Sequence, residues 1–409
     1  SIWIQDHATF SLLPVSGELA VTEKARASDF EHQNEIAQPS YYKVDLDTWK
    51  ATAEVTPTER AARFRFTFHQ PTNASFLVID VFKSDKPCSV KIFPSENKII
   101  GIARNNSGAV PDNFGDYFVI VFDRPFKAYG VWSGDKIKAG VTNLEGKHVG
   151  AYVKFDTSVN PVVECKSSAS YISFDQAGRS LQQEIGDADF DTVRHRAEDV
   201  WNQALGRVQI QGGSAEQRRT FYSALYRSIL FPHRFYDFDE SHHPIHYSPY
   251  DGKVHQGVLY TDSGFWDTFR AAHPLYNLLF PEVSAEILQG LLNAYDQSGW
   301  LPSWASPGHR ACMIGNHAFS LLADGWGAWP PVPGLFPAGW VNGATFPPLV
   351  VTNLFQHPQG LALPLACAAL LVAAVPGHRR LLVAALLVLL CSRVQILVAA
   401  CAGLALVVV

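Results

Sequence analysis

Residues 117–122 read YFVIVF, a short run of aromatic and β-branched side chains between two aspartates. The run FLVI at 76–79 has the same character, and in FRFTF at 64–68 phenylalanines alternate with polar residues. Successive side chains of a strand point to opposite faces, so short segments with this period of two indicate strands. Several such segments, closely spaced between Tyr41 and about Thr157, predict an antiparallel β-sandwich.

The period of the apolar residues changes after this region. The segments SFDQ at 173–176 and SAEQ at 214–217 have the spacing of a capping box at a helix start. A proline at 281 opens a third expected helix, and a fourth is expected at 317–324. After the first capped segment comes a second helical stripe of Val193, Ala197, Val200, Trp201, Ala204 and Leu205, and the stripe after the cap at Ser214 comprises Phe221, Ala224, Leu225 and Ile229. We therefore expect a β + α multidomain fold in which consecutive helices follow the sandwich.

Composition limits the classes of function. The net charge is −5 without a basic tract, so we expect no nucleic-acid partner. The six cysteines form no CxxC pair, which gives no support for a zinc or iron–sulfur site. The 10 Trp, 14 Tyr and 26 Phe residues suit a large core or stacking against sugar rings. Two glycosylation sequons, at 73–75 and 105–107, would suit a secreted protein, although residues 1–4 show no signal peptide.

The last part of the chain differs in kind. Residues 325–409 contain no Asp, Glu or Lys, although the chain holds 38 acidic residues. A membrane helix needs roughly 20 apolar residues, and the apolar run 381–409 contains Arg393. A soluble helix would need a polar face, which this run lacks. We interpret residues 325–409 as an aberrant low-complexity tail from a shifted reading frame or a retained intron, with a membrane anchor at 361–409 as the alternative.

Three segments carry candidate binding chemistry: GFWDTFR at 264–270, GWLPSW at 299–304 and MIGNHA at 313–318. In the first, Trp266 and Asp267 are adjacent and Arg270 follows one helical turn later.

A carboxylate and a guanidinium bind pairs of sugar hydroxyls, and indole faces contact the C–H side of the ring. The alternative is that the aromatic residues pack between helices and that Asp267 and Arg270 form an ordinary ion pair. Spacing alone favours this second interpretation.

The three motifs, in this order, resemble the signature of glycoside hydrolase family 92, the calcium-dependent exo-α-mannosidases. The segments FYSALYR at 221–227 and FDRPF at 122–126 also fit this family. The resemblance covers roughly residues 12–324.

The resemblance implies an N-terminal β-sandwich followed by an (α/α)6 toroid, here only in part, with the active site between them. The domains would be residues 1–165 (sandwich, its N-terminal part missing), 166–190 (linker helix), 191–324 (first helices of the catalytic toroid) and 325–409 (tail). It also implies hydrolysis of terminal α-linked mannose of N-glycans or mannans, with inversion and with Ca²⁺, by a secreted or extracellular enzyme.

The resemblance also suggests roles for individual residues. The substrate-binding candidates are Trp266, Asp267, Arg270, Trp300, Trp304 and Arg310. Asp267 is the first candidate ligand of a sugar hydroxyl. For Asn316, helix capping is a sufficient explanation, and for His317 a place in the core is as acceptable as a site role.

Two departures from the family pattern affect the expected activity. Ser303 stands where the family usually carries a basic residue. The family's acid, base and most calcium ligands lie in later helices, and this chain has no Asp or Glu after Asp324. We therefore assign no catalytic residue, leave the metal ligands unknown, and expect a chain that is truncated at both ends and inactive. The alternatives are a mannose-binding or membrane-anchored remnant and a toroidal disaccharide phosphorylase. For the family-level activity, we expect hydrolysis of α-1,2-linked mannose.

Overall fold

The structure is a computed structural model that describes residues 7, 9–106, 108–315 and 317–322. Two compact units are recognised, one comprising Ser1–Ser263 with Leu278–Arg310 and the other Gly264–Asn277 with Ala311–Val409. The tail expected at 325–409, with its possible membrane anchor, lies outside the described residues.

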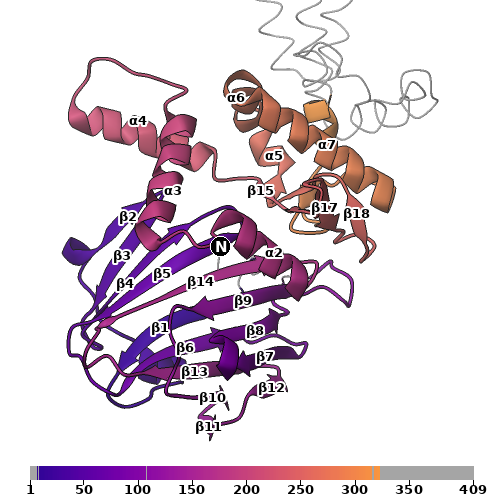
Figure 1. The fold of residues 1–409 in the computed structure, drawn as a ribbon. Coiled ribbons are helices and arrows are strands. Elements are labelled where there is room, and N and C mark those ends of the chain that lie inside the picture. The colour runs from indigo at the N-terminus through magenta and orange to yellow at the C-terminus, as the bar shows by residue number, and fades with distance from the viewer. Residues whose placement is uncertain (1–6, 8, 107, 316, 323–409) are drawn as a thin grey trace, which may run out of the picture. The chain divides into compact units, whose positions relative to one another are not determined.

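An antiparallel β-sandwich forms most of the first unit, as predicted (Figure 1). One sheet has the strand order β1 (Ser11–Ser16), β6 (Ser75–Val81), β13 (Val149–Phe155), β10 (Ala128–Ser133) and β11 (Lys136–Ala139). The other has nine strands: β12 (Asn143–Gly146), β7 (Cys88–Phe93), β8 (Lys98–Ala103), β9 (Asp116–Phe122), β14 (Val162–Ser170), β5 (Ala61–Phe68), β4 (Ala51–Pro57), β3 (Tyr41–Leu46) and β2 (Ile36–Gln38). The last large strand, β14, continues past the boundary expected at residue 165.

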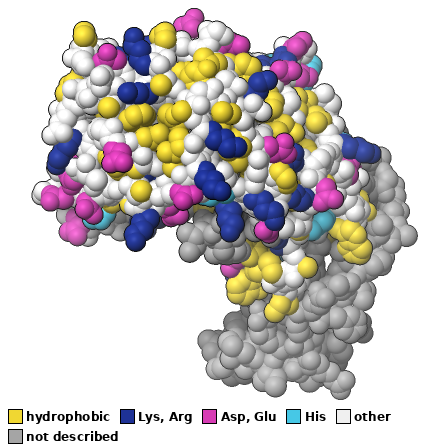
Figure 2. Space-filling view, turned by 90° about the horizontal axis from the view of Figure 1, so that it is seen from below, with side chains coloured by type: hydrophobic (Ala, Val, Ile, Leu, Met, Phe, Trp, Pro, Cys, Tyr) yellow, Lys and Arg dark blue, Asp and Glu magenta, His cyan; other side chains and the backbone are white. Residues whose placement is uncertain are grey.

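The inner faces of the two sheets share one apolar core. Strand β6 is buried along its whole length, which explains its uninterrupted apolar sequence. Phe66, Phe118 and Phe155 are fully buried and are contributed by both sheets. Short turns of helix, α1 (Glu23–Arg26), η1 (His32–Asn34) and η2 (Pro94–Glu96), connect the strands at the surface. Lys, Arg, Asp and Glu side chains are interspersed with apolar ones on the face in Figure 2.

Helix α2 (Phe174–Glu184) covers part of the nine-stranded sheet. Ala177 and Leu181 pack against sheet residues in a small buried cluster. The Ser173 hydroxyl caps the helix by accepting the backbone N–H of Gln176. The capping-box spacing also predicts that the Gln176 side chain accepts the backbone N–H of Ser173. This prediction was wrong, because the Gln176 amide donates to the carbonyl of Phe238 instead.

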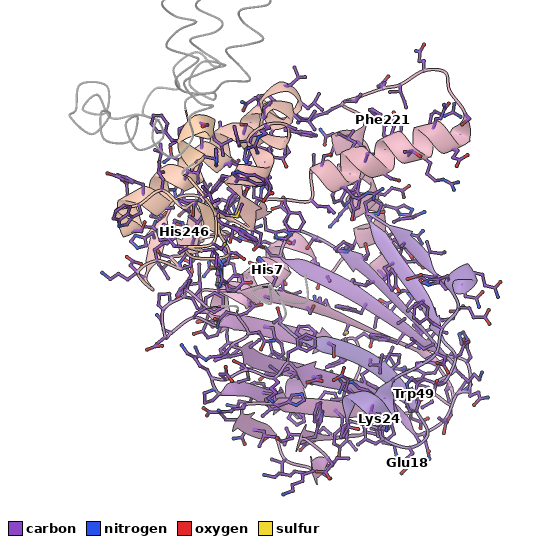
Figure 3. All side chains as sticks on the ribbon, turned by 180° about the vertical axis from the view of Figure 1, so that it is seen from behind. His7, Glu18, Lys24, Trp49, Phe221 and His246 are labelled. Carbon is purple, nitrogen blue, oxygen red and sulfur yellow. The ribbon has the colours of Figure 1, made fainter. Side chains whose placement is uncertain are left out.

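The apolar stripes predicted for the next two helices are mostly not buried. In α3 (Phe190–Leu205) Phe190 and Val193 are buried, but Val200 is 63 % exposed. Helix α4 (Ala215–Ser228) begins with the predicted capping box and buries only Leu225. Figure 3 shows α4, with Phe221, extending away from the sheets, so its apolar face has few partners in the first unit.

Short strands lie between the helices. The sequence had predicted consecutive helices and did not predict these strands. They are β15 (His233–Arg234), β16 (Asp237–Phe238), β17 (Pro244–Tyr247), β18 (Val254–Gln256), β19 (Tyr260–Thr261) and β20 (Ser263–Gly264). Pro244, Gly252 and Gly257 in this region disfavour a continuous helix; both glycines have positive φ.

Helices resume with α5 (Phe265–Thr268), α6 (Ala272–Leu279) and α7 (Pro281–Ser298). Pro281 opens α7 as predicted, and Gly299, at φ +77°, ends it. Strand β21 (Trp304–Ala305) follows, and residues 318–322 begin the fourth expected helix. In the described part of the chain, every helix is too short or too polar to cross a bilayer.

Candidate functional site

Three of the predicted binding residues lie on and just after α5, in the second unit. Trp266 and Asp267 are exposed, and the Arg270 guanidinium lies 4.8 Å from the centre of the Trp266 ring. The same guanidinium lies 4.3 Å from the Phe269 ring centre and donates to the carbonyl of Trp266. The alternative expectation of an Asp267–Arg270 ion pair was wrong, because Arg270 folds back over the two rings. The Asp267 carboxylate therefore remains exposed to solvent beside an aromatic surface.

The other three predicted residues lie in the first unit. Trp300 is 74 % exposed, while Trp304 on β21 is half-buried. The backbone N–H of Arg310 donates to the carbonyl of Trp304 at 2.9 Å, and Arg310 Nε donates to Ser306 at 2.6 Å. The structure thus brings Trp304 and Arg310 together. Ser303 stands at the position where the family usually carries a basic residue. Its hydroxyl donates to the carbonyl of Arg310 at 3.1 Å.

In the second unit, His317 is buried and stacks on Phe269, with ring centres 4.4 Å apart. This contact supports the core alternative for His317. Asn316 lies outside the described residues.

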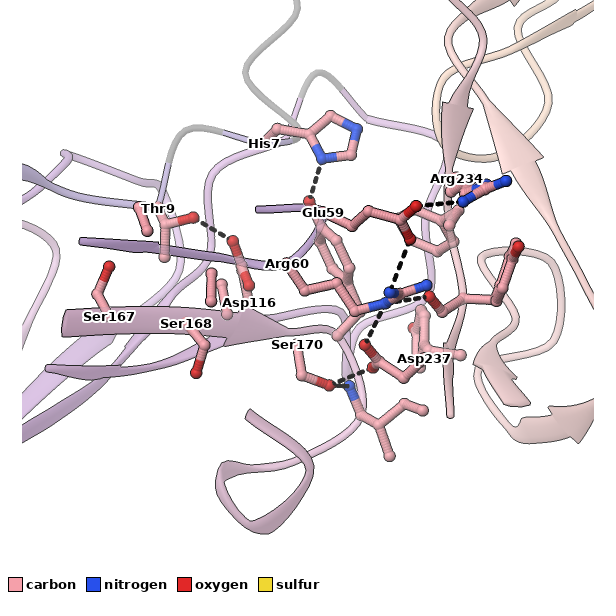
Figure 4. Close-up of a pocket in the computed structure, with 18 of the residues that line it drawn as sticks. His7, Thr9, Glu59, Arg60, Asp116, Ser167, Ser168, Ser170, Arg234 and Asp237 are labelled. Atoms are coloured by element: carbon pink, nitrogen blue, oxygen red, sulfur yellow. Dashed lines mark hydrogen bonds and ion pairs between the residues drawn. The ribbon is translucent and has the colours of Figure 1, made fainter. Parts of the chain in front are cut away.

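A cavity of about 400 Å³ lies in the first unit, and none of the predicted residues lines it. Its walls combine aromatic rings with charged groups from distant parts of the chain (Figure 4). The acidic, basic and histidine members are His7, Glu59, Arg60, Asp116, Arg234, Asp237 and His246. A mixture of aromatic surface and a few polar groups is typical of small-molecule pockets.

Two buried carboxyl groups of this cavity have raised pKa values. Burial raises the pKa of Asp116 to about 6, against the opposing effect of a hydrogen bond from Thr9. Asp116 Oδ1 is buried and has no hydrogen-bond partner among the described residues. Burial likewise raises the pKa of Asp237 to about 6, although Ser170 donates to it at 2.6 Å and Arg60 lies 3.3 Å away. Both groups therefore titrate near pH 6.

Arg60 is held in place by several acceptors around the cavity. Its Nε donates to the carbonyl of Tyr236 at 2.7 Å, and its Nη1 lies 3.0 Å from Glu184 and 3.1 Å from Glu59. Because these bonds use most of its donors, the guanidinium is a fixed positive charge beside Asp237.

A cluster of two imidazoles and one carboxylate lies at the edge of this region. His7 and His233 both contact Oδ2 of Asp262, at 2.8 Å and 2.7 Å. Burial would raise the pKa of Asp262, but hydrogen bonds from His233 and His7 hold it well below its usual range. Asp262 is thus a carboxylate throughout the physiological pH range.

Sequence analysis found neither the cavity nor the cluster. Arg60, Asp116 and Asp237 are far apart in sequence and share no motif, and only the tertiary structure shows that the two aspartates are buried. Asp262 lies two residues before the GFWDTFR segment, but its partners at 7 and 233 have no recognisable spacing.

Most of the calcium ligands that the resemblance implies were expected beyond Asp324, so only a minority could lie in the described ranges. Ca²⁺ takes six to eight oxygen ligands. The one group of metal-ligand type found there offers two imidazole nitrogens and one carboxylate oxygen. This donor set does not fit Ca²⁺.

Comparisons with known proteins identify the family. Residues 1–170 match the model of the glycosyl hydrolase family 92 N-terminal domain, and residues 176–328 match the family 92 catalytic domain. An inverting mannosidase of this family from Bacteroides thetaiotaomicron is 42 % identical, with a TM-score of 0.75, over 80 % of this chain and 43 % of its own.

Two further relatives are consistent with this family assignment. A second Bacteroides thetaiotaomicron α-mannosidase, solved with mannoimidazole, is 28 % identical, with a TM-score of 0.70, over 77 % of this chain and 43 % of its own. An uncharacterized secreted glycosidase from Arthroderma benhamiae is 28 % identical over 52 % of this chain and 30 % of its own. The chain therefore spans less than half the length of these relatives. Together, the matched models and the shared sandwich and helical architecture show that this chain belongs to glycosyl hydrolase family 92.

Proposed function

We propose that this chain binds terminal α-linked mannose, and that the whole protein hydrolyses that linkage with inversion. One solved relative is described as an inverting mannosidase, and another binds mannoimidazole. The observation in this structure that carries the proposal is the arrangement of Trp266, Asp267 and Arg270.

This arrangement has the parts that a sugar site needs. The Asp267 carboxylate can accept two hydroxyl hydrogen bonds, and it is not engaged by Arg270. The Trp266 ring is 40 % exposed and offers an apolar face to the C–H side of a pyranose. Arg270 is already ordered by the rings of Trp266 and Phe269, so little side-chain entropy is lost on binding.

A specific observation favours binding without turnover for this chain. Inversion requires an acid and a base whose carboxyl groups are roughly 6.5–9.5 Å apart. The family resemblance places both beyond Asp324, where this sequence has no acidic residue. Mannose binding without catalysis is therefore the second candidate function.

The experiment measures binding and turnover separately on the full chain. Binding of methyl α-mannoside is followed by saturation-transfer NMR, with methyl α-galactoside as the comparison sugar. Turnover of α-1,2-mannobiose is followed by proton NMR, with Ca²⁺ and with a chelator, and β-mannose as the first product indicates inversion.

The variant Asp267→Asn is expected to weaken mannoside binding at least about tenfold, since a charged acceptor for two hydroxyls is lost. Asp135→Asn, at an exposed position of the sandwich, is the matched control and should bind normally. Binding that is unchanged in Asp267→Asn would contradict the assigned site. Binding without any product would select the second candidate function.

Localisation and glycan class also remain proposals. A relative described as a secreted glycosidase supports an extracellular location, and we propose N-glycans or mannans as the substrates there. Detection of the protein in the culture medium of expressing cells tests the location.

A further inference from the structure

His7, His233 and Asp262 converge from three separate parts of the first unit. Strand β15 pairs with β19 so that His233 lies opposite Thr261, and Asp262 is the next residue. His7 precedes β1 and reaches the same carboxylate; Figure 4 shows its ring at the cavity. The fold, rather than any sequence motif, assembles these three side chains.

The distances are close to those of a metal site. The three potential ligand atoms lie within 4.8 Å of one another, and both imidazoles approach the same carboxylate oxygen. In a tetrahedral zinc site, bonds of about 2.1 Å separate the ligand atoms by about 3.4 Å. The contacts of 2.7 and 2.8 Å would have to open by roughly 0.6–0.7 Å to admit an ion, and the two imidazole nitrogens, now within 4.8 Å of each other, would have to settle about 3.4 Å apart. The His7 and His233 side chains are 37 % and 44 % exposed, which leaves a path from solvent.

Neighbouring residues already orient the ligands. Ser306 donates to Asp262 Oδ1 at 2.9 Å, which leaves Oδ2 directed at the imidazoles. The Tyr171 hydroxyl lies 2.8 Å from Nδ1 of His7, so this nitrogen is engaged and Nε2 faces the carboxylate. Metal-binding histidines and carboxylates usually have such partners on their other polar atom.

The donor set selects the kind of ion. Two imidazole nitrogens and one carboxylate oxygen suit Zn²⁺ and its first-row neighbours, whereas Ca²⁺ and Mg²⁺ prefer oxygen alone. We infer that His7, His233 and Asp262 form a binding site for a divalent transition-metal ion of the Zn²⁺ type. Three protein ligands leave a coordination position open for water or an exogenous ligand. Metal binding at these three residues does not depend on the proposed binding of mannosides.

The test uses Co²⁺ as a spectroscopic probe on the chelator-treated full chain without any sugar. Binding at these residues should give one equivalent of tightly bound Co²⁺, with the visible absorption of a site of low coordination number. Zn²⁺ should displace Co²⁺, and an equal concentration of Ca²⁺ should not. Zn²⁺ should also raise the melting temperature, because it binds the folded state.

Variants locate the ion. His233→Gln is expected to weaken Co²⁺ binding more than tenfold, and Ser306→Ala about tenfold through the loss of carboxylate orientation. The control is His255→Gln, since His255 forms a similar His–Asp contact, 2.9 Å from Asp251, without a second histidine on that carboxylate. Circular dichroism of each variant establishes that it is folded.

Two outcomes would overturn the site. One is an absence of Co²⁺ absorption in the folded wild-type chain. The other is binding that is equally strong in wild type and in folded His233→Gln, which would place the ion elsewhere. In either case, His7, His233 and Asp262 form only a hydrogen-bonded network.

Discussion

Asp116 illustrates how burial changes the chemistry of a single residue. It opens strand β9, is 4 % exposed, and burial raises the pKa of its carboxyl from 3.8 to about 6. The folded state therefore binds more protons than the unfolded state between about pH 4 and pH 6. Consequently, this residue lowers the free energy of unfolding as the pH rises through that window.

The variant Asp116→Asn should remove this pH dependence. Relative to wild type, its free energy of unfolding is expected to increase by on the order of 2 kcal/mol between pH 4 and pH 7, because the neutral amide avoids the cost of a buried charge. Urea unfolding at several pH values measures the difference. The exposed variant Asp135→Asn should show a much smaller change. A constant difference between Asp116→Asn and wild type across this range would contradict the raised pKa.

At the scale of elements, close packing of the sheets depends on positions without a side chain. A Cβ atom on Gly150 of β13 would lie 2.2 Å from the Trp132 ring and 2.4 Å from the backbone oxygen of Ile79. Gly178 of α2 presents the opposite case, since a Cβ atom there would meet nothing within 4 Å. The same substitution should therefore have opposite effects in the two elements.

We expect Gly150→Ala to lower the free energy of unfolding by about 1–3 kcal/mol or more, because Trp132 and the neighbouring strand must move. Gly178→Ala should raise it by about 0.5–1 kcal/mol, since alanine restricts the unfolded chain and favours the helix. Denaturant midpoints of the two variants and wild type provide the measurement. Equal effects of the two substitutions would show that these contacts are not formed.

Helix ends offer a second comparison between elements. Ser173 caps α2, which packs on the sheet, and Ser214 caps α4, which buries only Leu225. Ser173→Ala should reduce the global free energy of unfolding by about 1 kcal/mol. Ser214→Ala should instead speed hydrogen exchange of the first-turn amides of α4, with little change in the global midpoint. A global loss of stability in Ser214→Ala would show that α4 folds together with the sandwich.

At the scale of the whole molecule, the sandwich with α2 and α3 contains its own core. Phe190 of α3 is fully buried and packs near Tyr41. The Arg65 guanidinium lies over the Phe190 ring, 4.3 Å from the centre of that ring. These contacts join the helix to the nine-stranded sheet, so residues 1–205 should fold as an independent unit.

A fragment of residues 1–205 is expected to melt in one cooperative transition. Phe190→Ala in this fragment should cost about 3–5 kcal/mol through the cavity that it leaves. Val200→Ala on the same helix, where the side chain is 63 % exposed, should change stability by less than about 0.5 kcal/mol. Calorimetry measures both, and aggregation of the fragment without a transition would contradict an independent core.

The sequence by itself determined the sandwich, the position of α7 and the family. Strand periodicity, Pro281 and the ordered motifs from 264 to 318 are local signals, and local backbone preferences act without reference to the rest of the chain. The same signals were insufficient for α3 and α4, because an apolar stripe shows that a face can be buried but not whether a partner covers it.

Only the tertiary structure decided which charged groups meet. The Asp267–Arg270 ion pair has the correct helical spacing, yet Arg270 lies over Trp266 and Phe269 instead. The Thr9–Asp116 and His7–Asp262 contacts each join residues more than 100 positions apart, and His233 reaches Asp262 across 29 positions. The physical reason is that desolvation and ion pairing are set by spatial neighbours, which no local pattern of residues specifies.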